Sequence, residues 1–165
     1  MSGRLLCPLR GLVAAAGSLP WVFALAGARP AAAVALFHGV CHQLPERTAC
    51  LSGVAMLVCS RCAGIYAGVA LGAVLPAPRC WAPHARKLLF LAAVPLLADV
   101  ISQATGAMPI LHVTRLMTGA LAGWLASALL FAALRIERAA TSDAYAAERS
   151  ANPNLPSPIR RDGDA

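Results

Sequence analysis

Acidic residues are scarce over most of this sequence of 165 residues. Up to Leu134 only Glu46 and Asp99 carry a carboxylate, and charged residues of both signs make up 13% of the chain. Aromatic residues are also few, at 5%, whereas hydrophobic residues reach 59%. Soluble domains carry about twice that share of charge. The composition therefore argues against a soluble domain and predicts a membrane protein whose main partner is the lipid bilayer.

The sequence also lacks a basic stripe, although its formal net charge is +7. Proteins that bind nucleic acid gather their Lys and Arg residues on one face or along one helix. Here the arginines lie between apolar segments, which is the pattern of topology signals that flank membrane spans. Nucleic acid is therefore not an expected partner.

Four apolar segments predict about four transmembrane helices. They cover residues 11–28, 59–75, 88–105 and 110–134. The predicted fold class is an all-α, polytopic membrane helix bundle in residues 1–134, with a cysteine-rich loop at 29–58. The polar residues 135–165 are expected to form a disordered tail. The first segment also fits a cleaved signal peptide that ends at Ala26-Gly27-Ala28, but the small apolar residues that follow favour a retained span.

Basic residues predict the orientation of these helices. The N-terminus, the turn with Arg79, Arg86 and Lys87, and the exit at Arg135 all carry positive charge. The positive-inside rule places these segments in the cytoplasm. The cysteine-rich loop then faces the outer side of a cytoplasmic membrane. At that same side the second span begins, the third ends and the fourth begins.

This topology gathers polar side chains in the outer half of the bundle. Asp99 lies inside the third span, and an ionisable residue in that position is a functional candidate by default. Asp99 and Gln103 are four residues apart, so they share a helix face. The candidate ion-pair partners of Asp99 are Arg61 and Arg115. A structural ion pair that fixes the helix register is the simpler interpretation.

Small residues recur at every fourth position on the second and fourth spans. This spacing lets helix backbones approach closely in lipid. We expect these two ridges to face neighbouring helices, which would draw Ser60 and Arg115 toward the interior. The glycines of the ridges are Gly64, Gly68, Gly72, Gly119 and Gly123.

Four cysteines lie near the start of the second span. Two residues separate Cys59 from Cys62. Cys41 is followed directly by His42, and Cys50 lies in the loop. A two-residue spacer lets both sulfurs reach one metal ion, and thiolates and imidazoles bind Zn²⁺ and softer ions. Thiol redox chemistry is an alternative, because a helix N-terminus stabilises a thiolate. Plain disulfides that brace an outer loop are the third interpretation.

Several of these residues resemble the motif of a known family. The run CHQLPER at 41–47, the run CSRCAGIYAG at 59–68, Asp99 with Gln103, and Arg115 with Thr118-Gly119 resemble the prokaryotic membrane-protein family called domain of unknown function 2085 (DUF2085). The resemblance covers roughly residues 37–123 and implies a small polytopic membrane protein. The motif positions in this chain are Cys41, His42, Gln43, Arg47, Cys59, Arg61, Cys62, Gly64, Tyr66, Gly68, Asp99, Gln103, Arg115 and Gly119.

The chain departs from the family's pattern at two places. The family has Ser-Phe where this chain has Thr48-Ala49, and Gly where this chain has Val100. Cys50 lies outside the motif. The resemblance therefore implies a metal site rather than an obligatory redox pair of Cys41 and Cys50, with Cys41, His42, Cys59 and Cys62 as its ligands.

The leading hypothesis is a membrane metal-binding protein, with zinc as the first metal and copper or iron next. Arg61, Asp99, Gln103 and Arg115 would surround the ligands or form a polar path. One alternative is a membrane thiol–disulfide oxidoreductase, in which Cys59 and Cys62 would be the reactive residues and a quinone the electron acceptor. A structural or assembly subunit is another. The sequence is compatible with a homo-oligomer and with a complex with a membrane partner protein.

Overall fold

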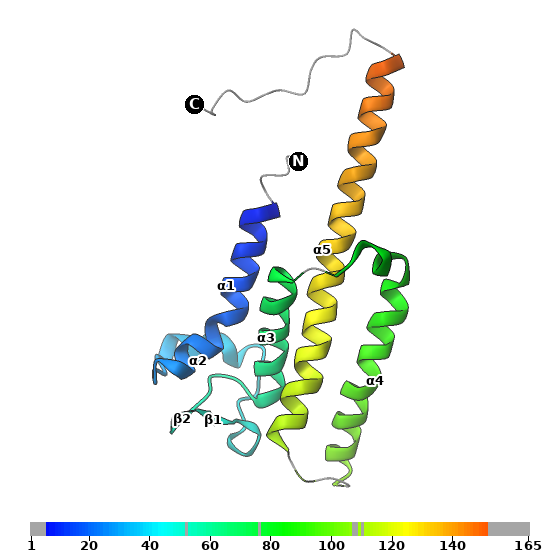
Figure 1. The fold of residues 1–165 in the computed structure, drawn as a ribbon. Coiled ribbons are helices and arrows are strands. Elements are labelled where there is room, and N and C mark those ends of the chain that lie inside the picture. Colours follow the sequence, from blue (N-terminus) through cyan, green and yellow to red (C-terminus); the bar gives the residue numbers. More distant parts are fainter. Residues whose placement is uncertain (1–5, 52, 76, 107–108, 110, 152–165) are drawn as a thin grey trace. The chain divides into compact units, whose positions relative to one another are not determined.

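The computed structural model describes residues 6–51, 53–75, 77–106, 109 and 111–151. It divides into two units, residues 1–132 and 133–165. The first unit is built from helices, and the longer ones run alternately up and down in Figure 1. The helices are α1 (Leu6–Leu25), α2 (Ala31–His38), α3 (Ser60–Val74), α4 (Ala85–Ala104) and α5 (His112–Ala151). The shorter elements are the 3-10 helices η2 (Pro45–Arg47) and η3 (Arg79–His84) and the strands β1 (Cys50–Leu51) and β2 (Val54–Ala55).

The helix lengths confirm the predicted all-α membrane bundle. Three helices are long and apolar enough to cross a membrane: α1, α4 and the part of α5 from His112 to Arg135. Helix α3 is also apolar but has only 15 residues, so it is about 22 Å long. Among the described residues the helices therefore include three full-length candidate spans, whereas α2 and α3 are shorter.

Helix α5 continues beyond the predicted end of the fourth span. We predicted that a disordered tail begins at Arg135, whereas the structure remains helical to Ala151. Alanine has the highest helix propensity, and the segment that follows Arg138 is rich in it, at positions 139, 140, 144, 146, 147 and 151. Residues 152–165 of the predicted tail lie outside the described part of the chain.

The glycine ridges of α3 and α5 face neighbouring helices, as predicted, and the structure shows that they face each other. A Cβ atom added at Gly64 or Gly68 would collide with the carbonyl oxygen of Leu116 or Ala120, respectively, on α5. In the opposite direction, a Cβ at Gly119 would collide with the carbonyl oxygen of Arg61. Only glycine lets the two backbones approach this closely.

Helix α1 packs against the other side of α3. A Cβ atom at Gly17 would lie 2.7 Å from the carbonyl oxygen of Tyr66. One turn further along α1, the indole Nε1 of Trp21 donates a hydrogen bond of 3.0 Å to the carbonyl oxygen of Ala63. These contacts join α1 to the first two turns of α3, close to the cysteines.

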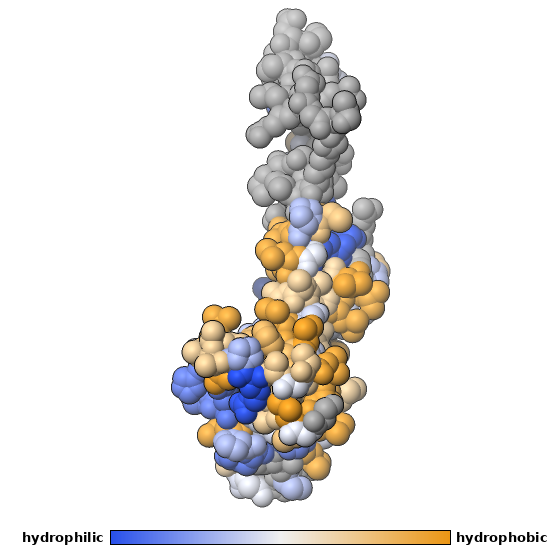
Figure 2. Space-filling model, turned by 90° about the vertical axis from the view of Figure 1, so that its left-hand side faces the viewer, coloured by the Kyte–Doolittle hydropathy of each residue, from blue (hydrophilic) through white to orange (hydrophobic). Residues whose placement is uncertain are grey.

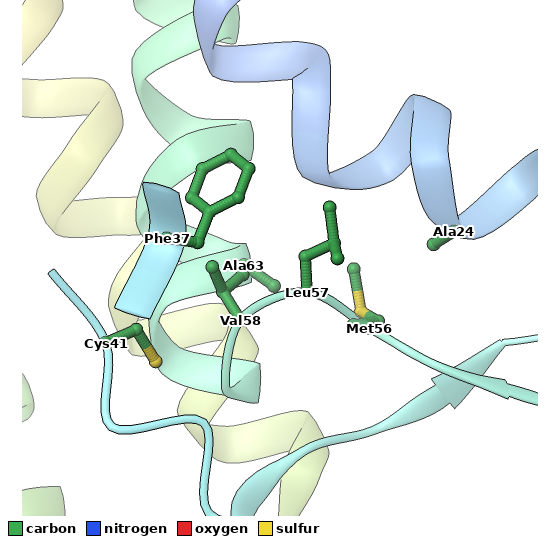
Figure 3. Packing of buried hydrophobic residues seen from close by; sticks show 7 residues of the cluster. All are labelled: Ala24, Phe37, Cys41, Met56, Leu57, Val58 and Ala63. Atoms are coloured by element: carbon green, nitrogen blue, oxygen red, sulfur yellow. The ribbon is translucent and has the colours of Figure 1, made fainter. Parts of the chain in front are cut away.

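The loop between α1 and α3 contains more structure than the sequence predicted. Its apolar first part forms α2, and β1 pairs with β2 as an antiparallel hairpin with Cys50 opposite Ala55. Figure 3 shows the hydrophobic cluster that joins the loop to α1 and α3. It is formed by Ala24, Phe37, Cys41, Met56, Leu57, Val58 and Ala63. Figure 2 shows apolar side chains over the middle of one face and most of the polar ones toward its lower end.

Candidate metal centre

Three of the predicted ligands come together at the start of α3. The sulfur atoms of Cys41, Cys59 and Cys62 all lie within 4.8 Å of one another. Cys41 is buried in the hydrophobic cluster, whereas Cys59 and Cys62 are half-buried. We call these three residues the thiol group. Its members come from two segments, the turn after α2 and the beginning of α3.

Backbone geometry holds these two segments together. The N–H of Cys59 donates a hydrogen bond of 3.2 Å to the Cys41 sulfur. Cys59 is the N-cap residue of α3, with an extended backbone. Gln43 adopts a positive φ of 50°, and its side-chain amide donates hydrogen bonds to the carbonyl oxygens of Val34 (3.1 Å) and Leu57 (2.7 Å). Gln43 therefore ties the turn that carries Cys41 to both α2 and the segment that leads to Cys59.

His42 and Cys50 are not members of the thiol group. The His42 side chain is exposed and lines the same pocket as the three cysteines. Cys50 lies on β1, where its thiol is free and exposed. The structure therefore brings together three of the four ligands that the resemblance implied, and places the fourth at the pocket.

The neighbours of the Cys59 thiol lower its pKa. A hydrogen bond from the Cys62 side chain lowers the pKa of Cys59 to about 5, against the opposing effect of burial. Hydrogen bonds from the Cys62 backbone and from the Cys41 side chain lower this pKa further. At neutral pH Cys59 is therefore a thiolate, which is the form that binds metals and attacks disulfides.

The predicted polar residues form one continuous network. Arg61 makes an ion pair with Asp99, and its Nε donates to Oδ2 of that carboxylate at 3.2 Å. The Gln103 amide donates to Asp99 Oδ1 at 2.6 Å. Gln103 in turn accepts a hydrogen bond from Nε of Arg115. The network therefore links α3, α4 and α5 beside the thiol group.

One polar contact was not predicted from the sequence. The hydroxyl of Ser60, which is fully buried, lies 2.6 Å from Nδ1 of His112 and donates to the backbone oxygen of Arg47 at 3.1 Å. Ser60 belongs to the small-residue ridge of α3, and the predicted topology placed His112 at the same end of the bundle. Those two signals together could have identified the pair.

A pocket opens onto the thiol group. It has a volume of about 300 Å³ and is lined by the three cysteines, His42, Gln43 and three arginines. The arginines are Arg47 from η2, Arg61 from α3 and Arg115 from α5. The pocket therefore combines soft sulfur donors with hard, positively charged groups.

These features define an integral membrane helix bundle that carries a thiol group and an arginine-lined pocket at one end. A family model described as "Predicted membrane protein (DUF2085)" matches residues 41–129, which is more than half of the chain. The protein belongs to this family, as the motif residues led us to expect. The match begins at Cys41 and includes the whole thiol group and the whole polar network.

One relative comes from the archaeon Methanocaldococcus jannaschii and is described as an uncharacterized protein. It is 32% identical to this chain over 100 residues, which cover 54% of this chain and 60% of the relative. This chain therefore spans less than two thirds of the relative's length. No solved structure matches this chain.

Proposed function

We propose that this protein binds a transition-metal ion through the thiolates of Cys41, Cys59 and Cys62. The observation that carries this proposal is the mutual distance of the three sulfur atoms, which is at most 4.8 Å. Sulfurs around a tetrahedral Zn²⁺ are about 3.8 Å apart, given a Zn–S bond of about 2.3 Å. Closing the group around an ion therefore requires movements of about 1 Å or less.

Zinc is the first choice of metal, with copper(I) and iron next. Thiolate ligands select these soft or borderline ions over Mg²⁺ or Ca²⁺. Cys59 is already ionised at neutral pH because of its lowered pKa of about 5, so one proton fewer has to leave when the ion binds. Three thiolates alone leave a tetrahedral ion with one vacant position.

The vacant position would face the pocket. Structural zinc sites are closed by four protein ligands, whereas sites that exchange or activate a ligand keep one position open. His42 lies on the pocket wall and is exposed, so it does not close the site in the arrangement described above. We therefore propose an exchangeable fourth position.

The polar network would hold the site in shape. Arg61 lies between Cys59 and Cys62 in the sequence, and Asp99 fixes its guanidinium from α4. A fixed positive charge beside thiolates stabilises their ionised form. In this proposal Asp99, Gln103 and Arg115 position Arg61 and do not bind the metal themselves.

Metal analysis of the detergent-purified protein tests this proposal. We expect about one ion per chain in the wild type, because three thiolates share one ion, and we expect its loss in Cys59→Ser/Cys62→Ser. A matched control is Cys50→Ser/Cys80→Ser, which removes two exposed thiols outside the group and should keep the ion. A wild-type protein without metal after purification in metal-containing buffer would overturn the proposal.

A second candidate function is thiol–disulfide exchange, which the lowered pKa of Cys59 favours. Cys59 and Cys62 would form a disulfide by losing two protons and two electrons to a membrane quinone. Removing the second cysteine should then trap a partner on the first. A mixed disulfide in Cys62→Ser that is absent from Cys59→Ser would support this function, and its absence under oxidising conditions would exclude it.

We further propose that the protein lies in a prokaryotic cytoplasmic membrane with the thiol group on the outer side. The exposed Cys50 in the loop and the exposed Cys80 at the opposite end of α3 are natural reporters. A membrane-impermeant maleimide added to intact cells should label Cys50, and should label Cys80 only after permeabilisation. The reverse pattern, mapped by peptide mass spectrometry, would reverse the orientation.

A further inference from the structure

Three arginines from separate elements meet at one pocket. Arg47 is in η2, Arg61 is in the first turn of α3 and Arg115 is in the first turn of α5. They line the same cavity of about 300 Å³. Guanidinium groups repel one another, so their convergence on one cavity requires compensating negative charge.

The described part of the chain supplies only part of that charge. Within residues 6–151, apart from the undescribed positions, Asp99 is the one carboxylate paired with these arginines, and its partner is Arg61. Among the described residues, the positive charges of the other two arginines therefore remain without a carboxylate. A divalent ion held by three thiolates would offset one of them and leave the other unbalanced.

Arg115 is the clearest case of an unbalanced charge. Its side chain is only 2% exposed, and Nε donates its hydrogen bond to the neutral Gln103. Within the described residues no carboxylate lies within ion-pair distance of this guanidinium. Buried arginines are normally paired with an anion. The described residues therefore do not supply a counter-ion for Arg115, and the pocket beside it is the place where an external anion would bind.

Arg47 lines the same pocket but is differently placed. Its backbone oxygen accepts from Ser60, which fixes the backbone of η2 beside α3. The side chain itself is exposed and makes no ion pair with another described residue. An exposed arginine and a buried one therefore line the same pocket, and two guanidiniums can together bind one oxyanion.

We propose that this pocket binds a small anion of the phosphate or carboxylate class through Arg47 and Arg115, beside the thiol group. The anion could be a free small molecule or the phosphate of a lipid headgroup, since both present the same oxygens. This site goes beyond the proposed metal function, because the arginines do not depend on the metal for their charge.

Calorimetric titration of the protein in maltoside micelles with inorganic phosphate and with succinate tests this proposal. At least one of the two anions should bind to the wild type. Arg47→Gln and Arg115→Gln should each weaken that binding about tenfold or more, because each variant loses one or several charge-assisted hydrogen bonds. The control is Arg86→Gln, which removes an exposed arginine from the N-terminal turn of α4 and should leave binding unchanged.

If Arg115→Gln fails to fold, Arg47→Gln still tests the proposal, because the Arg47 side chain is exposed and its replacement should not disturb folding. Failure of both anions to bind, or equal binding by wild type and Arg47→Gln, would overturn the proposal. Reconstitution in phosphatidylglycerol nanodiscs then identifies the source of the anion. Loss of phosphate binding there assigns the site to a lipid headgroup, and retention assigns it to a soluble anion; either result supports an anion site.

The same titration separates this proposal from the metal site. The variant Cys59→Ser/Cys62→Ser removes two of the three sulfurs but none of the arginines. We expect it to lose the metal and to keep anion binding within a few-fold. A variant that retains metal but binds the anion about tenfold more weakly or worse, as expected of Arg47→Gln, completes the distinction. Loss of anion binding in the folded cysteine variant would overturn the claim that the arginines suffice.

Discussion

The contact between α3 and α5 gives the sharpest stability prediction, for Gly68→Ala. The new methyl group would lie 2.7 Å from the backbone nitrogen of Trp124, whereas non-bonded heavy atoms normally stay about 3.5 Å apart. It would also collide with the carbonyl oxygen of Ala120. Both obstacles are backbone atoms of a helix, so no side-chain rotation can relieve the clash.

The helices would have to separate by about 1 Å, which forfeits a quarter to a half of the dispersion energy along the contact. Overpacking of this kind costs about 1–3 kcal/mol. We place Gly68→Ala at the upper end, about 3 kcal/mol, because two backbone clashes coincide. The equilibrium constant for unfolding should then rise about 100-fold.

The assay is reversible unfolding in mixed micelles with increasing dodecyl sulfate, followed by circular dichroism. The control is Gly11→Ala in α1, where an added Cβ has no neighbour within 4 Å. That change should leave stability equal or slightly higher, because alanine favours a helix. Gly68→Ala within about 0.5 kcal/mol of wild type would refute the close backbone packing described above.

Three further predictions concern the site. Asp99→Asn leaves the part-buried Arg61 without its counter-charge and should destabilise the protein by about 3 kcal/mol in the same unfolding assay. The control Thr105→Ala, at the exposed end of α4, should destabilise the protein much less. His42→Ala should keep about one metal ion per chain if three thiolates suffice; complete loss of the ion by mass spectrometry would make this histidine a ligand. In metal-free protein the iodoacetamide reaction of Cys59 should be nearly independent of pH between about 6 and 8, because a pKa of about 5 leaves it ionised throughout. Free cysteine in the same buffers should instead react faster as the pH rises, and a parallel rise for Cys59 would contradict the lowered pKa.

Helical periodicity predicted the parts of this fold that depend on spacing alone. The four-residue repeat of small residues predicted that α3 and α5 each pack closely against a neighbouring helix. The collisions expected at Gly64, Gly68 and Gly119 confirm close packing and show that the two helices pack against each other. The spacing of Asp99 and Gln103 likewise predicted a shared face, and the two side chains are hydrogen-bonded. Such features follow from helix geometry and need no information about the loops.

The loop could not be predicted in the same way. The sequence showed neither that Gln43 adopts a positive φ nor that its amide bonds to the segments on both sides. The sequence did not show which of the adjacent residues Cys41 and His42 reaches the site. Only the path of the turn separates a buried sulfur from an exposed imidazole. Tertiary contacts decide these directions, and they are not local in the sequence.

The short length of α3 has a consequence for how the site meets the membrane. The helix is about 22 Å long, whereas the hydrocarbon core of a bilayer is about 30 Å thick. Non-helical backbone at membrane depth is tolerated where it lines a water-filled cavity, and the arginine-lined pocket lies at the Cys59 end of α3. We therefore expect the pocket to be a hydrated depression sunk below the lipid headgroups. Thicker bilayers would deepen it, so acyl-chain length would govern how fast ions and anions from the water reach the sulfur atoms.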